Sequence, residues 1–221
     1  MSMKIILKLF LVSLGFFGNL MAQNCDVTAA FVNIPDEYYQ TVNQEQRQLL
    51  INNYTAGDRD GIANQLRGRT RILDLRPETD WMRVQNSESA SLEIKLLRIN
   101  GQVRFNVLIF TACGPVCSSH VGLFDPNWNL LQVRIIPELT IEQFLDQEAV
   151  ARSGMSLQTL LARLGFPMIT YSFAEDGQTL SVELLSEELA DEESKKTLAG
   201  FLATRRMTFV WDQSSGHFVK Q

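Results

Sequence analysis

The sequence has few of the side chains that most catalytic and metal sites use. It contains only two histidines, His120 and His217, and three cysteines among its 221 residues. It also lacks a phosphate-binding loop, a dinucleotide-binding glycine fingerprint and a nucleophile elbow. These absences exclude the protein classes that those motifs define, and no sequence motif identifies a reaction. We therefore expect no catalytic residue, no metal ligand and no cofactor.

Runs of basic residues are also missing from the chain. Lysine and arginine together number 20 against 25 acidic residues, which gives a formal net charge of −5. Proteins that bind nucleic acid or anionic membranes concentrate positive charge on one surface. We therefore expect no nucleic-acid partner, while the partner or ligand itself stays unknown.

Long apolar runs are absent except near the N-terminus, where one extends from Ile5 to Phe17 and contains Lys8 and Ser13. It is too short to span a membrane, which takes about 20 residues. The segment begins with positive charge and ends in small and polar residues, as secretory signal peptides do. A buried N-terminal helix is the alternative. We predict a signal peptide over residues 1–22.

Cleavage after Ala22 would leave a mature chain, residues 23–221, in the periplasm or the medium. A lipoprotein anchored through Cys25 is the alternative. Lipid-modified cysteines usually follow a small residue and have leucine three positions earlier, whereas Asn24 precedes Cys25 and Ala22 holds the leucine position. We therefore favour an unanchored product without a transmembrane span. Its 199 residues (221 − 22) suffice for one domain with a sizeable core.

The clearest structural signal is a hairpin around Asn100-Gly101, because this pair favours a two-residue type I′ turn. The flanking strands would be Ser91–Ile99 and Gln102–Ala112. The register set by such a turn pairs Leu96 with Phe105, Ile94 with Val107, and Leu92 with Ile109. All six would share one apolar face, and the opposite face would carry polar residues: Glu93, Lys95, Arg104 and Asn106.

Further strands are expected after this hairpin. Ser119–Phe124, the turn Asp125-Pro126-Asn127 and Leu130–Ile135 would continue an antiparallel meander of at least four strands. A second hairpin around Asp176-Gly177 would pair three apolar couples: Phe173 with Leu180, Tyr171 with Val182, and Ile169 with Leu184. A last hairpin would set Trp211 opposite Phe218.

Helices are predicted between these runs of strands. Asn43 would cap a helix over 44–55, and apolar spacing favours helices over 140–146 and 156–164. An acidic stretch then leads into a helix that ends near Ala203. Strands that come in runs indicate an α+β fold, with an antiparallel sheet of meander and hairpins packed against several helices. We predict a single domain over 23–221, with a weak sub-boundary near 137–140.

Cys113 and Cys117 enclose the turn Gly114-Pro115-Val116 and could face each other across a hairpin. We interpret them as a candidate disulfide or as two free thiols. The redox alternative is less favoured, because the spacing differs from the CGPC of thioredoxin-like proteins. A Cys117/His120/Asp125 nucleophilic set would require convergence, yet strand alternation directs Cys117 and His120 to opposite faces.

Three other groups have a structural and a functional interpretation. Cys113, Cys117 and His120 lack a clear fourth ligand for zinc. The acidic group does not match a calcium loop, and a helix face or helix N-terminal charge explains it better; its members are Glu187, Glu188, Asp191, Glu192 and Glu193. Trp128 could stack on a sugar, contact a protein, or fold back on the sheet.

Several segments resemble an uncharacterised Bacteroidales family, domain of unknown function 3256. They are FVNIPDEYY, RQLLINNYTAG, LRGRTRILDL, SLEIKLL, the turn with Thr111, Gly114 and Pro115, LFDPNWNLL and TFVWDQSSGHF. The resemblance spans most of the mature chain and its motifs are mainly structural. It implies an exported envelope protein of unknown activity, and it transfers no functional residue to this sequence.

Composition and resemblance together favour a non-catalytic extracytoplasmic protein that binds a partner or stabilises an envelope assembly. A periplasmic small-ligand or glycan binder, with a pocket between sheet and helices, is the second hypothesis. The third is an enzyme with a dispersed site, for which the region from Cys113 to Asp125 is the best foothold.

Overall fold

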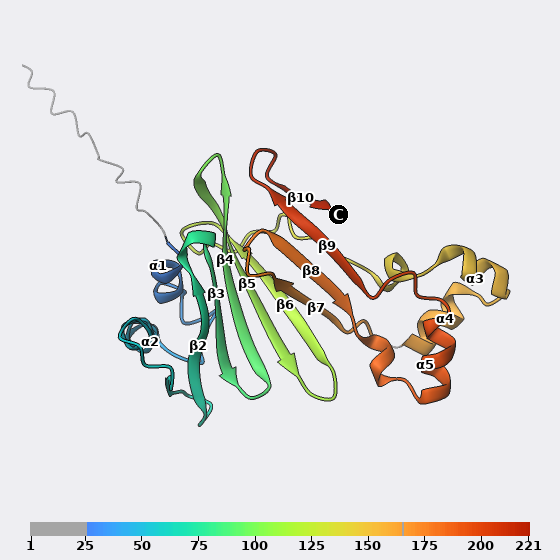
Figure 1. Ribbon diagram of the computed structural model, residues 1–221, viewed down its shortest axis with the longest axis horizontal. Helices are drawn as coiled ribbons and strands as arrows, with labels where there is room; N and C mark the ends of the chain where they lie inside the picture. The colour runs from blue at the N-terminus through green and yellow to red at the C-terminus, as the bar shows by residue number, and fades with distance from the viewer. Residues whose placement is uncertain (1–25, 165) are drawn as a thin grey trace, which may run out of the picture.

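The computed structural model describes residues 26–164 and 166–221. The predicted signal peptide and Cys25 lie outside the described residues. Within them, ten strands form two antiparallel sheets that lie between helices at the two ends of an elongated molecule (Figure 1). The α+β fold predicted from the sequence is confirmed.

The first sheet has six strands that follow one another in chain order. They are β1 (Ile62–Ala63), β2 (Arg69–Arg76), β3 (Trp81–Ser87), β4 (Ala90–Ile99), β5 (Gln102–Cys113) and β6 (Cys117–Phe124). A short 3-10 helix, η1 (Pro77–Thr79), joins β2 to β3. The antiparallel meander expected from the sequence is therefore present, and β6 forms one border of this sheet.

The second sheet has the order β10-β9-β8-β7 and is built from the last quarter of the chain. Its strands are β7 (Ile169–Phe173), β8 (Thr179–Leu184), β9 (Arg206–Asp212) and β10 (His217–Lys220). The strand β7 packs across the inner face of the first sheet, where it contacts β4, β5 and β6.

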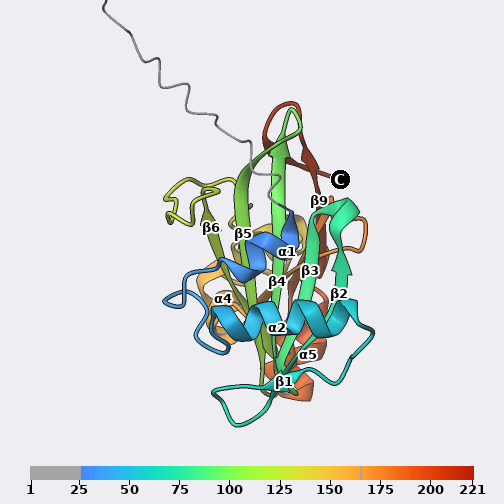
Figure 2. The same cartoon turned by 90° about the vertical axis from the view of Figure 1, so that its left-hand side faces the viewer.

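Two helices cover the outer face of the first sheet, where α1 (Val27–Val32) and α2 (Gln44–Thr55) lie across the strands (Figure 2). The predicted bounds of α2 are confirmed. Asn43 accepts a hydrogen bond from the backbone N–H of Gln46, and the Gln46 side chain accepts one from the Asn43 N–H. This capping box satisfies two backbone donors that an uncapped helix would leave open.

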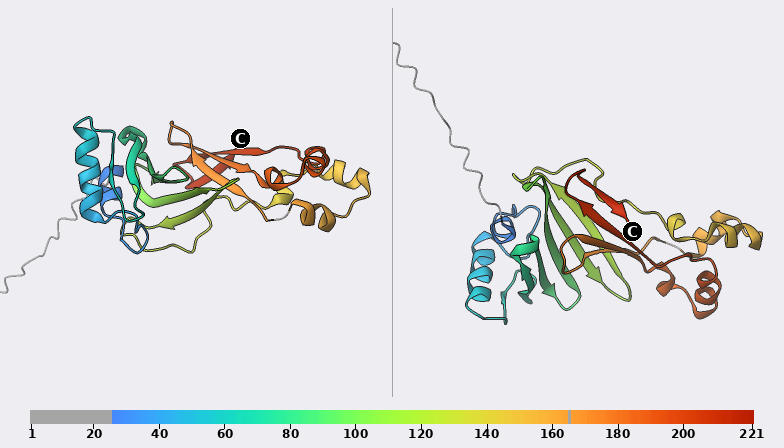
Figure 3. Two further views of the ribbon diagram at one scale, coloured as in Figure 1. Left: turned by 90° about the horizontal axis from the view of Figure 1, so that it is seen from below. Right: turned by 45° about the horizontal axis from the view of Figure 1, so that its top comes forward.

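The remaining helices lie at the opposite end of the molecule from α1 and α2 (Figure 3). They are η2 (Ile141–Phe144), α3 (Gln147–Ser153), α4 (Leu157–Leu164), η3 (Ser186–Leu189) and α5 (Glu192–Ala199). The helix expected over 156–164 is α4. The one expected over 140–146 is the short 3-10 helix η2, which ends at Phe144, and Asp146 caps α3 instead.

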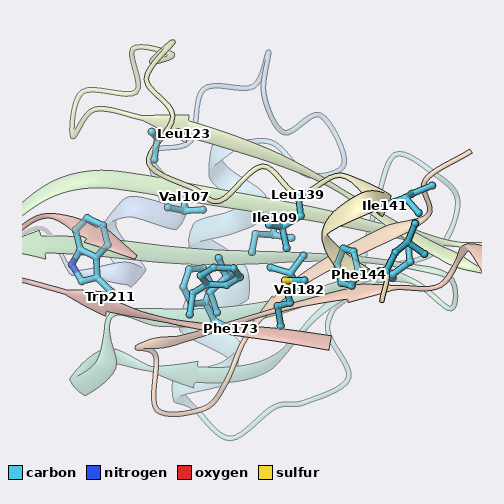
Figure 4. Packing of buried hydrophobic residues seen from close by; sticks show 14 of the residues in the cluster. Val107, Ile109, Leu123, Leu139, Ile141, Phe144, Phe173, Val182 and Trp211 are labelled. Carbon is cyan, nitrogen blue, oxygen red and sulfur yellow. The ribbon is translucent and has the colours of Figure 1, made fainter. Parts of the chain in front are cut away.

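Buried apolar side chains form two cores, one on each face of the first sheet. The outer core lies between that sheet and α1 and α2. The inner core joins the two sheets, and Val107 and Ile109 of β5 lie in it with Phe173 and Val182 of the second sheet (Figure 4). Leu139 also belongs to this inner core, which therefore continues across the segment where a sub-boundary is predicted.

The register predicted for the central hairpin is wrong beyond the first two pairs. Asn100 and Gly101 both have positive φ, 50° and 78°, as a type I′ turn requires. However, Arg98 pairs with Val103 and Leu97 pairs with Phe105, so Arg104 is left unpaired, and this β-bulge shifts every later pair by one residue. Leu96 pairs with Asn106, Ile94 with Leu108, and Leu92 with Phe110.

The bulge also changes which side chains share a face. Val107 and Ile109 are opposite Lys95 and Glu93, so they enter the inner core instead of the outer one. Glu93 and Lys95 are themselves buried, at 5% and 6% exposure. The face of β4 that the sequence predicts to be polar therefore lies against the inner core.

The two later hairpins have the predicted registers. Ile169 pairs with Leu184, Tyr171 with Val182, and Phe173 with Leu180. Trp211 lies opposite Phe218, and their ring centroids are 5.1 Å apart. The strand predicted over Leu130–Ile135 is wrong. Only Leu130 forms an isolated bridge to Phe124, after which the chain leaves the sheet.

Candidate functional site

The Cys117/His120/Asp125 set, which strand alternation argues against, does not converge in the structure either. Cys117 and His120 both lie on β6, where the alternation of the strand directs them to opposite faces. Cys113 and Cys117 are directly paired at the end of the β5–β6 hairpin, and their sulfur atoms form a disulfide. In this state neither cysteine has a thiol that could act as a nucleophile.

Asp125 organises the turn that follows β6. Its carboxylate accepts hydrogen bonds from the Asn127 N–H, the Asn129 N–H and the Asn129 side chain at 2.8–2.9 Å. These bonds, above all the one from the Asn129 side chain, lower the pKa of Asp125. Trp128 in the same turn folds back on the sheet, where it is 7% exposed and packs against Phe124. Both residues therefore shape a turn.

The acidic stretch caps a helix. Asp191 accepts the backbone N–H of Ser194 at the start of α5, and Lys195 pairs with Glu188 and Glu192 at 3.8 and 3.2 Å. The helix-terminus interpretation explains these groups. In the part of the chain that the structure describes, no three side chains of His, Cys, Asp or Glu are grouped so that they could hold a metal ion.

A cleft of about 450 Å³ lies along the outer border of β6. One wall is β6 from Ser119 to Leu123, and the other is the segment from Leu130 to Glu138. Tyr171 of β7 lies between the walls and donates from its hydroxyl to the Pro137 carbonyl at 3.1 Å. The volume of this cleft lies within the range of sites that bind small molecules.

The residues that line this cleft combine apolar and polar groups. Leu123 and Leu131 contribute apolar surface, whereas His120 of β6 is an exposed polar residue of the lining. Arg134 and Glu138 form an ion pair with N–O distance 3.4 Å on the opposite wall, with both side chains largely exposed. Burial raises the pKa of the Tyr171 hydroxyl above its ordinary value, so this group stays neutral and fixed as a hydrogen-bond donor.

We call residues 131–136 the strap. Three of its side chains, Leu131, Ile135 and Ile136, pack on the inner core, whereas Val133 is 54% exposed. A second cleft, of about 510 Å³, lies on its other side against Phe209 and Phe218. Hollows on both sides mean that the strap crosses the surface without joining either sheet.

The buried carboxylate of Glu93 links the two sheets. One Glu93 oxygen accepts the Trp81 indole N–H at 3.1 Å and the Phe173 backbone N–H at 3.0 Å, and the other pairs with Arg83 at 3.4 Å. Burial raises the Glu93 pKa, while Arg83 and the two N–H groups oppose that shift. These partners occupy the carboxylate, so we assign it a structural role.

Sequence reasoning missed the strap, Tyr171 and the border of β6. The alternation of Leu131, Val133 and Ile135 predicts a strand, and a strand would have covered that border. Pro137 lies beyond this segment and does not conflict with a strand there, so the sequence gives no local signal of the cleft.

None of the helices within 26–164 and 166–221 is both long and apolar enough to cross a membrane. No curated protein matches the chain significantly. A solved structure, described as a domain of an uncharacterised protein from Porphyromonas gingivalis W83, is similar with a TM-score of 0.68. It has 23% sequence identity, and the alignment covers 88% of this chain and 97% of that one, so the likeness shows a shared fold.

A family model described as "Protein of unknown function (DUF3256)" matches residues 18–218. The matched range contains the first sheet, the strap, the cleft beside β6, and the second sheet as far as Phe218 in β10. The chain therefore belongs to this family.

Proposed function

We propose that this chain is an exported, extracytoplasmic protein that binds a partner without catalysing a reaction, through the cleft beside β6. The single observation that carries the proposal is the cleft itself, about 450 Å³ in volume, with a strand border on one side and the strap on the other. Its lining of leucine, tyrosine and backbone offers apolar contact and hydrogen bonds, which are the elements of a binding site.

Two further features support export. The Cys113–Cys117 pairing is of a kind that persists in oxidising compartments and is rare in the cytosol. The pattern of charge and hydropathy in residues 1–22 is that of a signal peptide. The remaining residues, 23–221, would then act as one exported domain, with Cys25 not lipidated.

A small-ligand or glycan binder is the second candidate. The second cleft, beside Phe209 and Phe218, favours it, because aromatic rings with nearby polar side chains, here Arg134 and His217, are typical of sugar contacts. Phe218 is only half-buried, and its ring packs against Trp211 at a tilt of 59°. Thermal-shift screening against glycans would test this candidate, with Phe218→Ala as the variant that should abolish any shift.

The main proposal is tested in the source organism by fractionation combined with photo-crosslinking. A photoreactive residue replaces His120, which is exposed at the cleft, and in a control strain it replaces Leu49, which is 48% exposed on α2. We expect the protein in the extracytoplasmic fraction and a crosslinked product specific to position 120. Cytoplasmic residence, or the same products at both positions, would contradict the proposal.

A further inference from the structure

The border of β6 carries an inference that rests on the proposed function and names its ligand class. We propose that β6 binds an extended peptide as an added antiparallel strand, in the cleft between β6 and the strap. The peptide would alternate apolar and polar residues. The proposal depends on three features of the structure: the direction of the β6 backbone groups, the path of the strap, and the side chains around the cleft.

The β6 backbone already accepts the first rung of such a strand. The Leu131 N–H donates to the Leu123 carbonyl at 2.8 Å, and Leu130 bridges to Phe124 in antiparallel orientation. The Leu123 carbonyl therefore points away from β5. Because backbone groups alternate along a strand, the N–H and C=O groups of Val121 and Ser119 point the same way.

These outward groups are where a guest strand would bind. Among the described residues, no backbone hydrogen bond joins Val121 or Ser119 to a segment on the side of β6 that points away from β5. The Ser119 side chain is engaged, because its Oγ accepts the Tyr171 N–H at 3.1 Å and contacts the Thr111 hydroxyl at 2.8 Å. An unpaired strand border with this geometry is the template that β-strand addition uses.

The strap leaves this border open for a physical reason. Continued in the register of the Leu130–Phe124 bridge, the strap would place Val133 opposite Val121. It diverges instead, because Leu131, Ile135 and Ile136 are held on the inner core. Val133 stays 54% exposed, and the cleft opens where the missing rungs would be.

The walls of the cleft define the side-chain pattern of the guest. Odd-numbered residues of β6, such as Val121 and Leu123, face the inner core, so a guest side chain beside them meets apolar surface. The opposite face presents His120 and solvent. Neighbouring side chains of an extended peptide point to opposite faces, which favours an apolar-polar alternation.

The proposal is tested by selecting displayed nonapeptides on the purified mature protein and measuring their affinity for two variants. Val121→Pro removes the outward N–H at the centre of the border, and proline is tolerated where the N–H faces away from the ladder. Val121→Ala removes a similar amount of core contact and keeps the N–H. Circular dichroism and thermal unfolding establish that both variants fold.

We expect selected peptides with alternating apolar residues that bind Val121→Pro at least about tenfold more weakly than Val121→Ala, because a ladder hydrogen bond is lost and the ring obstructs the rung. N-methylation of alternate peptide amides on wild-type protein gives a second measurement, which is independent of the variants. Methylation of the amides that face β6 should abolish binding, while methylation of the intervening ones should not.

Failure to select any peptide, or peptides that bind both variants equally and tolerate methylation at every position, would overturn strand addition. The outcome is distinguishable from failure of the proposed function. A product crosslinked specifically at position 120 together with a negative peptide result leaves a binding protein whose ligand is not a strand. Absence of a crosslinked product specific to position 120 would instead contradict the proposed binding function.

Discussion

The hairpin around Asn100-Gly101 and the one around Asp176-Gly177 have similar sequence signals but different outcomes. In the second, all three predicted apolar pairs are present. In the first, the turn forms as predicted and a bulge at Arg104 then shifts the ladder by one residue. The same turn chemistry therefore fixes a turn without fixing the register of the strands beyond it.

The environments of the two hairpins explain the difference. Strand β8 buries only one face, which carries Leu180, Val182 and Leu184, so a one-residue shift would expose all of them. Strand β4 is buried on both faces, with Ile94 and Leu96 in the outer core and Leu97 in the inner one. Apolar side chains are buried there in either register, so the alternation of apolar and polar residues does not select one register over the other.

The largest contrast is expected from single-residue deletions. Deleting Ser181 from β8 should abolish folding, because it moves Val182 and Leu184 to the other face of the sheet. Deleting Arg104 should keep the fold, because this exposed residue is the unpaired one, and its removal leaves the Leu97–Phe105 and Arg98–Val103 pairs adjacent. Circular dichroism and gel filtration of the two purified deletions measure the difference.

A further deletion serves as the matched control within the first hairpin. Removing Leu108, four positions beyond the bulge, should unfold the protein as the Ser181 deletion does. If the bulge stays, Ile109 and the residues after it change faces, and if the bulge is lost, Phe105, Asn106 and Val107 change faces instead. If removal of Arg104 were as damaging as removal of Leu108, the bulge would be required for the fold and not a local insertion.

Two cross-strand ion pairs provide the next largest contrast. Arg83 lies opposite Glu93 in the first sheet, and Arg206 lies opposite Glu183 in the second. Glu93→Ala should lower the free energy of unfolding by about 3 kcal/mol, because the Trp81 and Phe173 N–H groups lose a buried acceptor. Urea unfolding at pH 7 measures this change.

Glu183→Ala is the control for that measurement, because its side chain is 34% exposed and its Arg206 partner is 61% exposed. Exposed pairs of this kind contribute about 0–1 kcal/mol. Equal losses of unfolding free energy in the two variants would show that the buried ion pair of the first sheet contributes no more to stability than the exposed pair of the second.

The sequence predicts local features of this fold well, because these features depend on contacts between residues that are close in the chain. Asn43 and the Gln46 side chain fix the start of α2 through bonds within four residues. The pairing of Trp211 with Phe218 follows in the same way from a four-residue loop. The bulge at Arg104 has no such local signal, because the inner core that selects it is completed by the second sheet, far along the chain.

The candidate site was predicted less well than the fold for the same reason. Strand alternation correctly separates Cys117 from His120. The cleft, however, arises where Leu131, Ile135 and Ile136 are held by an inner core that residues from both sheets complete. Only the assembled core shows that the strap turns away from β6.

The two glycines that close the turns provide a smaller contrast. Both have positive φ, so alanine at either position should cost about 1 kcal/mol in backbone strain. A Cβ at Gly101 would have no atom within 4 Å, whereas a Cβ at Gly177 would lie 2.6 Å from the Thr79 carbonyl oxygen. We expect Gly177→Ala to be about 2 kcal/mol less stable than Gly101→Ala in thermal unfolding. Equal melting temperatures would indicate that the second turn moves freely away from Thr79.

The smallest effect concerns Lys95, a cation on the buried inner face of β4. It is 6% exposed and donates from Nζ to the Thr79 carbonyl. Burial lowers its pKa from 10.5 to about 8, an effect that Arg98 reinforces and Asp80 and Asp176 oppose. Because the folded protein releases this proton near pH 8 while the unfolded chain holds it to about pH 10.5, stability should rise with pH.

The expected gain attributable to Lys95 is about 1 kcal/mol between pH 7 and pH 9, measured by urea unfolding at both pH values. Lys95→Met should remove this gain, because methionine fills a similar volume without a proton to release. Lys220→Met, on the exposed surface of β10, should retain it. If both variants kept the same rise, the pH dependence would come from groups outside the inner face of β4. Lys95 would then be hydrated in solution, and the first sheet, like the second, would have one face exposed to solvent.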